Sequence, residues 1–350
     1  MNADFLIVGQ GIAGSVLAWT LDQRGCSVIL ADDPGLPSAS AVAAGIVNPL
    51  TGRKLVRTWN ADELFPFLHQ FYRSIEQQLG VQFFHSKTIY RPFRSDDERK
   101  TYQELTADPA VRPYVTESPE DASYSQWINN PFGGLSVAQA GWVDLNEFVR
   151  LIKGYFIQKN QYYEGRVEQT DLVVGDTSAA WKGITFNRVI FCDGVQAQQN
   201  PLFNWLPFNP VKGQILTALV DGYSIPDIVN QGVFILPVRP GLIRIGATYS
   251  WHDLDWEISD DGREYLEAKV RAVLKIPYEI VNQQAGIRPS TKDRRPFVGL
   301  HKGKPVAGIF GGMGTKGVSL APYLAEQFAR HLLDGEELDS EANISRCVSL

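Results

Sequence analysis

The sequence predicts an α/β fold in which a Rossmann-like dinucleotide-binding domain is interrupted by a β-rich α+β domain. A glycine-rich turn joins an apolar strand to an amphipathic helix at the start of the chain, and strand and helix patterns return in its middle and at its end. Between about 205 and 285, strand signals dominate. We therefore expect the nucleotide domain to comprise residues 1–80, 141–204 and 285–350, and the inserted substrate domain to comprise residues 81–140 and 205–284.

The segment DFLIVGQGIAG near the start has the arrangement that binds a dinucleotide diphosphate. Its four consecutive apolar residues, FLIV, are typical of a strand that is buried on both faces of a parallel sheet. Gly9 permits a tight turn, Gly11 leaves space for phosphates, and Gly14 allows the following helix to lie close to the strand. A second apolar strand, SVILAD, ends at Asp32, whose carboxylate can accept hydrogen bonds from ribose hydroxyls.

Hydrophobic periodicity predicts the later elements in order along the chain. We expect a helix from about 62 to 80, a strand over 81–93, and a helix in GWVDLNEFVRLIKGYF with Asp144 or Asn146 as its N-cap. The polar, proline-broken segment from about 94 to 140 predicts a peripheral insertion. RVIFCDG predicts a buried strand, and the C-terminal region predicts a strand (VAGIFGG), a turn (MGTKG) and a helix (VSLAPYLAEQFARHLL).

Composition narrows the possible partners and compartment. The formal net charge of −6 argues against general binding to nucleic acid or anionic membranes, and we interpret the basic residues within 288–304 as a solvated face. The three cysteines form no C-x-x-C pair, which is compatible with a reducing compartment. No apolar run is long enough to cross a bilayer, and no signal peptide precedes the first strand. These observations favour a cytoplasmic protein. The five histidines lack metal-ligand spacing, so we expect no metal site. The pattern predicts no oligomeric state.

In order along nearly the entire chain, these motifs resemble the family of FAD-dependent amine and amino-acid oxidases that includes glycine oxidase, D-amino-acid oxidase and sarcosine oxidase. VGQGIAG with Asp32 is similar to the FAD fingerprint of that family, and SASAVAAGIVNP is similar to its flavin-side loop. PVKGQI, IRIGAT, GIRPSTKDRRPFVG and GGMGTKGVSLAP resemble its later landmarks. RVIFCDGVQAQ resembles the strand that usually ends in Ala-Gly-Ala-Trp, although this chain has Cys192-Asp193-Gly194-Val195 there.

The resemblance implies a bound FAD. Gly9, Gly11 and Gly14 would contact its pyrophosphate, Asp32 its ribose, and the backbone of Val167 its adenine. The other implied FAD-binding residues are Ser40, Ala44, Gly45, Gly194, Gly312, Gly314, Thr315, Lys316 and Gly317. GIRPSTKDRR contains no cysteine, and no histidine lies between the first glycine motif and GIVNP, so we expect the FAD to be held non-covalently.

The implied reaction is the oxidation of a C–N bond in an amino acid or secondary amine, in which hydride passes to flavin N5 and an imine forms. Arg288 takes the arginine position of the family's G-hydrophobic-R-P motif and would bind the substrate carboxylate; an internal ion pair is the alternative. Lys316 would place a positive charge near the flavin; the alternative is a surface lysine in a glycine turn. No general base is assigned, because an amine that binds in its neutral form needs none.

Two features of the sequence bear on the substrate. Glycine-oxidase relatives can have a second arginine in the turn where this chain has Thr315 and Lys316, which argues against simple glycine oxidation. Four aromatic residues are weak candidates for the pocket wall, since aromatic side chains in a β-rich domain are more often core: Tyr90, Tyr249, Trp251 and Trp256.

Two further functions are compatible with the sequence. One is a flavin domain that trims a carboxymethylaminomethyl group on transfer RNA, which the basic segment favours slightly and the acidic net charge disfavours. The other is a non-catalytic FAD-binding protein, which the departures at Cys192-Asp193 and Thr315-Lys316 allow. A small-molecule amine or amino acid is the expected partner, and nucleic acid is not.

Overall fold

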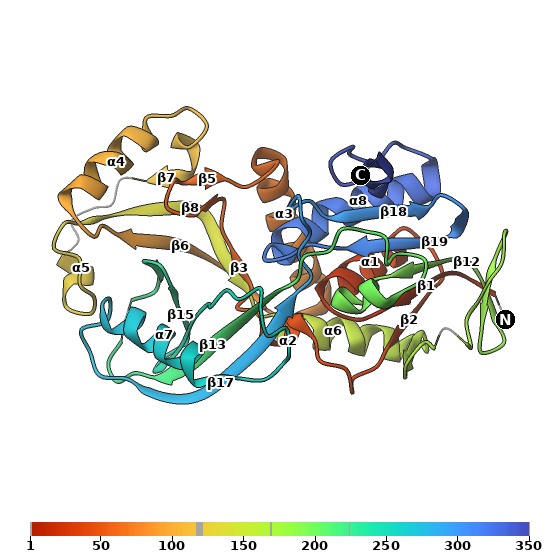
Figure 1. The fold of residues 1–350 in the computed structure, drawn as a ribbon, viewed down its shortest axis with the longest axis horizontal. Helices are drawn as coiled ribbons and strands as arrows, with labels where there is room; N and C mark the ends of the chain where they lie inside the picture. Colours follow the sequence, from red (N-terminus) through yellow and green to blue (C-terminus); the bar gives the residue numbers. More distant parts are fainter. Residues whose placement is uncertain (1, 117–121, 169, 224, 350) are drawn as a thin grey trace.

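The computed structural model describes residues 2–116, 122–168, 170–223 and 225–349. Its two large β-sheets lie end to end along the long axis of the molecule (Figure 1). The first sheet, with β1, β2 and β12, lies in the right half of Figure 1, and the second, with β6, β13 and β17, lies in the left half. This arrangement confirms the predicted α/β fold with an accompanying β-rich part.

The first sheet is built around parallel strands in the order β12-β1-β2-β9, with β19 parallel to β12. Its central strand is buried on both faces, as the FLIV run predicts. Phe5 and Ile7 belong to the core shared with the long helices, whereas Leu6 packs on the other face with residues of β11, β12 and 3-10 turns. The strands are β1 (Asn2–Val8), β2 (Val28–Asp32), β9 (Tyr162–Glu164), β10 (Val173–Val174), β11 (Ala179–Trp181), β12 (Ile184–Phe191), β18 (Phe297–His301) and β19 (Lys304–Gly311).

Four long helices accompany this sheet, and their ends follow the sequence signals. α1 (Ile12–Gln23) contacts both α6 (Leu145–Gln158) and α8 (Gly317–Asp334), and α3 (Ala61–Leu79) contacts α8. Asp144 caps α6 by accepting a hydrogen bond from the N–H of Glu147 at 3.1 Å, as predicted. α3 ends at Gly80, whose φ of +66° is a conformation that favours glycine.

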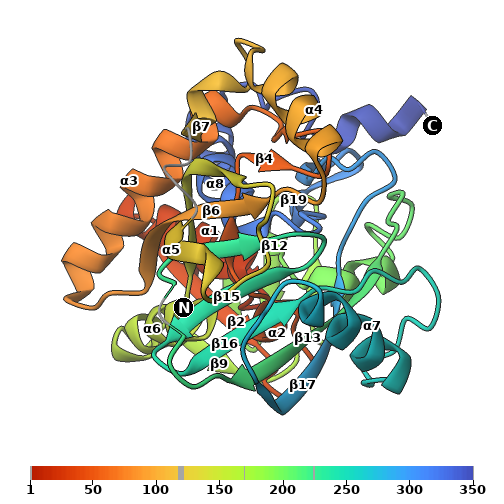
Figure 2. The same ribbon diagram turned by 90° about the vertical axis from the view of Figure 1, so that its left-hand side faces the viewer.

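The second sheet is mostly antiparallel, in the order β17-β13-β16-β15-β14-β6-β8-β3, with β7 paired to β8. Figure 2 looks onto this part of the molecule, with α4 at its upper margin and α7 at its right-hand margin. The strands are β3 (Ile46–Val47), β6 (Phe84–Pro92), β7 (Val115–Thr116), β8 (Gly134–Val143), β13 (Val211–Leu219), β14 (Ile228–Asn230), β15 (Phe234–Arg239), β16 (Leu242–Gly246) and β17 (Glu279–Arg288).

Shorter elements fill the connections. They are the helices α2 (Ala39–Val42), α4 (Asp96–Thr106), α5 (Ala122–Ser125) and α7 (Asp260–Arg271), the hairpin of β4 (Leu50–Thr51) and β5 (Val56–Arg57), and the 3-10 turns at Arg112–Tyr114, Gly194–Gln199 and Ile344–Ser349.

The expectation that residues 94–140 form a peripheral insertion is wrong for the end of that segment. β8 begins at Gly134 and pairs with both β6 and β3, and its residues Leu135 and Val137 are buried in the core. The prolines that suggested a loop lie before this strand, where they do not interrupt its hydrogen bonds. The proposed division into two domains stays a prediction, and β8 and β17 run across two of its boundaries.

Within the described ranges, no helix combines the length and hydrophobicity needed to cross a membrane. The same residues contain no group of His, Cys, Asp and Glu side chains placed to hold a metal ion.

Candidate functional site

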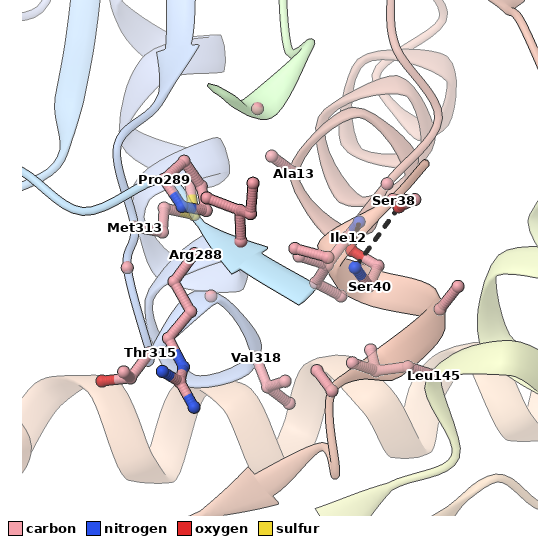
Figure 3. A pocket seen from close by; sticks show the side chains of 18 of the residues that line it. Ile12, Ala13, Ser38, Ser40, Leu145, Arg288, Pro289, Met313, Thr315 and Val318 are labelled. Atoms are coloured by element: carbon pink, nitrogen blue, oxygen red, sulfur yellow. Dashed lines mark hydrogen bonds between the residues drawn. The ribbon is translucent and has the colours of Figure 1, made fainter. Parts of the chain in front are cut away.

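A cavity of about 1240 Å³ is lined by residues of both sheets and of the loops between them. Ligand pockets usually occupy about 300–1,000 Å³, so this cavity has room for a dinucleotide and a second molecule together. Figure 3 shows part of its wall, to which segments far apart in the sequence contribute Ile12, Ser40, Arg288, Met313 and Thr315. Of the predicted site residues, those that line the cavity are Gly9, Gly11, Asp32, Ser40, Ala44, Gly45, Val167, Gly194, Arg288, Gly312, Gly314, Thr315, Lys316 and Gly317.

The first glycine turn is packed against the end of β12. Gly9 has a φ of +97°, and a Cβ atom there would lie 2.7 Å from the carbonyl oxygen of Cys192, so this position requires glycine. A Cβ atom at Gly14 would overlap the carbonyl oxygen of Gly9, and Gly14 does not line the cavity. The structure therefore places Gly14 where helix α1 packs on the strand, as its motif position predicts, rather than on the cavity surface.

The start of α1 presents a dipole and backbone donors to the cavity. The N–H groups of a first helical turn have no acceptor within their own helix, and they carry the positive end of its dipole. Ser40 Oγ accepts from the N–H of Ile12 at 3.0 Å, which ties the segment that follows β2 to this turn. Such a helix start, approached closely through Gly11, fits the diphosphate of a dinucleotide.

Asp32 is fixed at the end of β2 by the turn that it faces. Its Oδ1 accepts a hydrogen bond from the N–H of Gln10 at 2.9 Å, and the Gln10 amide group donates to the carbonyl oxygen of Val149 at 2.7 Å. Burial raises the pKa of Asp32 above its ordinary value. The carboxylate lies on the cavity, where ribose hydroxyls would be natural donors.

The loop after α2 is held by an arginine of the second sheet. Arg244 of β16 donates to the carbonyl oxygens of Val42 at 2.5 Å and Ala43 at 3.0 Å. A Cβ atom at Gly45, which has a φ of +71°, would overlap the carbonyl oxygen of Val143. These contacts fix the backbone of residues 42–45 along the cavity wall.

Asp193 is an unusual group on this wall. Its Oδ1 atom is buried and has no hydrogen-bond partner within the described part of the chain. Burial raises the pKa of Asp193 to about 7, because the charged form is poorly solvated there. The residue stands directly beneath Gly9, where a Cβ atom would lie 2.9 Å from the Asp193 Cα.

Arg288 stands at the end of β17 and points its guanidinium along the cavity. Its Nη1 donates to the carbonyl oxygens of Thr248 at 3.2 Å and Lys212 at 3.3 Å, and its Cζ lies 4.4 Å from the centre of the Tyr249 ring. No ion pair of Arg288 occurs among the described residues, so the internal ion pair considered from the sequence is absent there. Burial lowers the pKa of the Arg288 guanidinium, which nevertheless stays protonated.

The second glycine turn lies between β19 and α8. Gly312 and Gly314 have φ values of +69° and +54°, so the turn needs glycine at both positions. Lys316 is the N-cap of α8, and its Nζ donates to Thr58 Oγ1 at 3.0 Å. Burial, together with Arg295 and Arg294, lowers the pKa of Lys316 to about 8. Lys316 is therefore half-buried and bound, rather than a free surface lysine.

The weaker aromatic candidates divide into two groups. Tyr249 and Trp256 line the cavity, whereas Tyr90 lies fully buried in the core and Trp251 is exposed away from the cavity wall.

Sequence reasoning did not identify several residues that build the site. Gln10 lies inside the glycine motif, and its position there is the signal that could have found it. Arg244 and Arg91 stand in ordinary strand patterns, IRIGAT and TIYRPF, and no local signal distinguishes them. Their role depends on contacts with loops far away in the sequence.

The fold, the glycine turn and Asp32 on this cavity define a dinucleotide-binding protein. Residues 4–331 match the family of FAD dependent oxidoreductases (DAO). The chain belongs to this family, and FAD is its cofactor.

Comparison with solved structures gives the same fold. The chain superposes on glycine oxidase from Bacillus cereus with a TM-score of 0.78 and 20% identity, covering 96% of each chain. It superposes on iminodiacetate oxidase from Chelativorans sp. with a TM-score of 0.76 and 18% identity, covering 98% of each chain. At this level of identity, the likeness shows the fold alone.

Curated relatives include proteins named tRNA 5-methylaminomethyl-2-thiouridine biosynthesis bifunctional protein MnmC. The one from Aromatoleum aromaticum is 27% identical and is matched over 97% of this chain and 58% of its own length. The one from Chromohalobacter salexigens is 24% identical and is matched over 84% of this chain and 45% of its own length. The chain thus spans about half the length of these relatives.

Proposed function

We propose that this chain oxidises the C–N bond of an amino acid or secondary amine that carries a carboxylate group. The observation that carries the proposal is Arg288, a half-buried cation on the cavity wall with no acidic partner among the residues described. Removing a cation from water without a counter-charge is unfavourable, so such a group is suited to bind an anionic ligand.

The surroundings of Arg288 favour a carboxylate in particular. The carbonyl oxygens of Thr248 and Lys212 hold the guanidinium in one orientation, and the Tyr249 ring covers one face. A guanidinium held in this way offers paired N–H donors that match the two oxygens of a carboxylate. Binding the carboxylate there would orient the rest of the amine in front of the cofactor.

FAD, when bound, accepts the hydride that leaves the carbon next to nitrogen. Gly9, Gly11 and the start of α1 would hold its diphosphate, because they present backbone N–H donors to the cavity. Asp32 would hold its ribose, because its carboxylate on the cavity wall can accept hydrogen bonds from ribose hydroxyls. The positive end of the α8 dipole and the ammonium group of Lys316, which is hydrogen-bonded to Thr58, would stabilise negative charge on the flavin ring. We assign no general base, as an amine that binds neutral loses no proton before oxidation.

The test is anaerobic mixing of the FAD-loaded protein with a panel of amino acids and N-alkylglycines. We expect the visible flavin absorbance to bleach with at least one of them, and the Arg288→Met variant to require a much higher amine concentration for the same rate. Lys292→Met, four residues away and outside the cavity wall, is the control. A panel that leaves the oxidised spectrum unchanged, or equal behaviour of Arg288→Met and wild type, contradicts the proposal.

A second candidate is the same oxidation on the aminomethyl side chain of a transfer RNA nucleoside. It is supported by the MnmC relatives, whose names refer to tRNA and whose matched region covers most of this chain. The basic segment supports it only weakly, since Arg295 is paired with Glu341 and Lys304 donates to the carbonyl oxygen of Val174. Retardation of unmodified and carboxymethylaminomethyl-modified tRNA in native gels tests it; migration of both species at the free position would exclude it.

A further inference from the structure

Part of the cavity wall carries three arginines that the proposed reaction does not use. Arg53 follows β4, and Arg91 and Arg94 stand at and just beyond the end of β6. We refer to Arg53, Arg91 and Arg94 as the arginine cluster. All three line the same cavity as Arg288.

Hydrogen bonds and one ion pair connect the members of the cluster through the residues around them. Arg91 is only 8% exposed, and its Nη2 donates to the carbonyl oxygen of Gly52 at 2.8 Å and to the Tyr102 hydroxyl at 3.2 Å. These bonds place Arg91 directly beside Arg53, the neighbour of Gly52. Arg94 is connected to the same group because its backbone N–H donates to Glu98 Oε2 at 2.6 Å.

Acidic groups do not balance the charge of this cluster. Glu98, the acidic residue that lines this part of the wall, lies 3.8 Å from Arg53. Within the described ranges, neither Arg91 nor Arg94 forms an ion pair. One carboxylate therefore faces three guanidinium groups, of which Arg91 is buried and Arg53 and Arg94 are exposed. This excess of positive charge favours an anion in this part of the cavity.

The strand order separates the cluster from Arg288. Arg288 is on β17 and Arg91 on β6, at opposite ends of the order β17-β13-β16-β15-β14-β6. Five strand spacings of about 4.8 Å give a path of about 24 Å along a flat sheet, which the curvature of a twisted sheet shortens. Between the two ends, the wall includes the apolar side chains of Ile215 on β13 and Phe234 on β15.

We propose that the arginine cluster binds a second anionic group, carboxylate or phosphate, at the far end of a substrate whose first carboxylate is held by Arg288. The inference rests on the proposed function and narrows it to an elongated amine with two anionic ends and a less polar middle. Single-carboxylate amino acids such as glycine would leave the cluster empty.

Inert ligands test this inference without requiring oxidation. The FAD-loaded protein is titrated with straight-chain dicarboxylates from succinate to hexadecanedioate, with monocarboxylates of equal chain length, and with the corresponding ω-phosphonocarboxylates. Binding is measured as perturbation of the visible flavin spectrum and by calorimetry. We expect the dianions to bind about tenfold or more tightly than monocarboxylates once the chain is long enough to span both sites. The phosphonates distinguish a phosphate-adapted cluster from a carboxylate-adapted one.

The variants locate the second site. In Arg53→Gln/Arg94→Gln we expect the preference for dianions to disappear while monocarboxylate affinity stays unchanged; buried Arg91 is left in place to protect folding. The control is Arg57→Gln, an exposed arginine of the same segment that pairs with Asp62 at 2.7 Å and does not line the cavity.

Failure of this inference differs from failure of the proposed function. Monocarboxylate binding with no dianion preference at any length, or a preference that survives the double substitution, overturns the inference and leaves the proposed function standing. Dianion binding that depends on the cluster, in a protein whose flavin no amine reduces, supports the inference and contradicts the proposed function. Absence of binding by every ligand overturns the inference.

Discussion

A Cβ atom at Gly213 would overlap the Nη2 atom of Arg288. β13 and β17 pair antiparallel with Gly213 opposite Gly286, two residues before Arg288, so the long arginine side chain lies across the bare backbone of Gly213. The glycine therefore determines where the guanidinium sits, although it makes no contact with substrate in the proposed reaction.

This relationship predicts that Gly213→Ala weakens carboxylate binding with the arginine still present. The added methyl group would push the guanidinium away from the carbonyl oxygens of Thr248 and Lys212, so we expect the Kd of a simple carboxylate to rise about tenfold. Flavin spectral titration measures the change, and FAD content should stay at the wild-type level. Gly154→Ala on α6, where a Cβ atom meets nothing within 4 Å, is the matched control. Wild-type affinity in Gly213→Ala would show that Gly213 does not position Arg288.

Two substitutions in the first glycine motif should separate cofactor binding from folding. At Gly11 the backbone suits any residue and a Cβ atom would lie 3.1 Å from Ser40 Oγ, so Gly11→Ala should fold normally but bind FAD at least tenfold more weakly. At Gly14 a Cβ atom overlaps the backbone of Gly9, so Gly14→Ala should lower the free energy of unfolding by more than about 2 kcal/mol. Denaturation of the FAD-free proteins and FAD titration measure both effects. Equal destabilisation by the two changes would contradict the distinction.

The parts of the fold that the sequence predicts are those encoded by neighbouring residues. The glycine turn, the strand ending at Asp32 and the capped helix α6 each depend on contacts within a few turns of chain, and the structure has all three. The start of β8 was not predicted, because the prolines and polar residues before it are typical of a loop. Its pairing with β6, some forty residues earlier in the chain, is not encoded by neighbouring residues.

The site shows the same limit. The predicted lining residues come from motifs, whereas Arg244 acts through loop carbonyls about two hundred residues distant, and Arg91 through Gly52 and Tyr102. From the sequence, Asp193 is recognisable only as a departure from the usual motif. Its burial without a hydrogen-bond partner depends on packing that only the folded chain has.

Lys316 should raise the reduction potential of the bound FAD in a pH-dependent way. Its charged ammonium group would stabilise the negative charge of the reduced cofactor, so Lys316→Met should lower the two-electron potential at pH 7 by on the order of 30 mV, equivalent to a factor of ten. Because the pKa of Lys316 is lowered to about 8, the difference between wild type and variant should shrink as pH rises through that value. Dye-linked spectroelectrochemical titration measures the potentials, and exposed Lys302→Met is the control. A constant difference, or none, would mean that the ammonium group bound to Thr58 does not act on the flavin.

Asp193 should make the stability of the FAD-free chain fall with rising pH. Burial raises its pKa from an ordinary value of 3.8 to about 7, so between these values the folded chain binds more protons than the unfolded chain. Folding then becomes less favourable as pH rises from about 4 to 7, and the loss is complete above pH 7. Asp193→Asn carries no titrating group at this position. The thermal midpoint of the variant minus that of the wild type should therefore increase between pH 4 and 7 and stay constant above pH 7. Differential scanning calorimetry at several pH values measures the difference, with Asp176→Asn on the exposed surface as the control. An advantage that does not change with pH, or that declines as pH rises, would show that the Asp193 carboxyl is not held protonated in the folded chain.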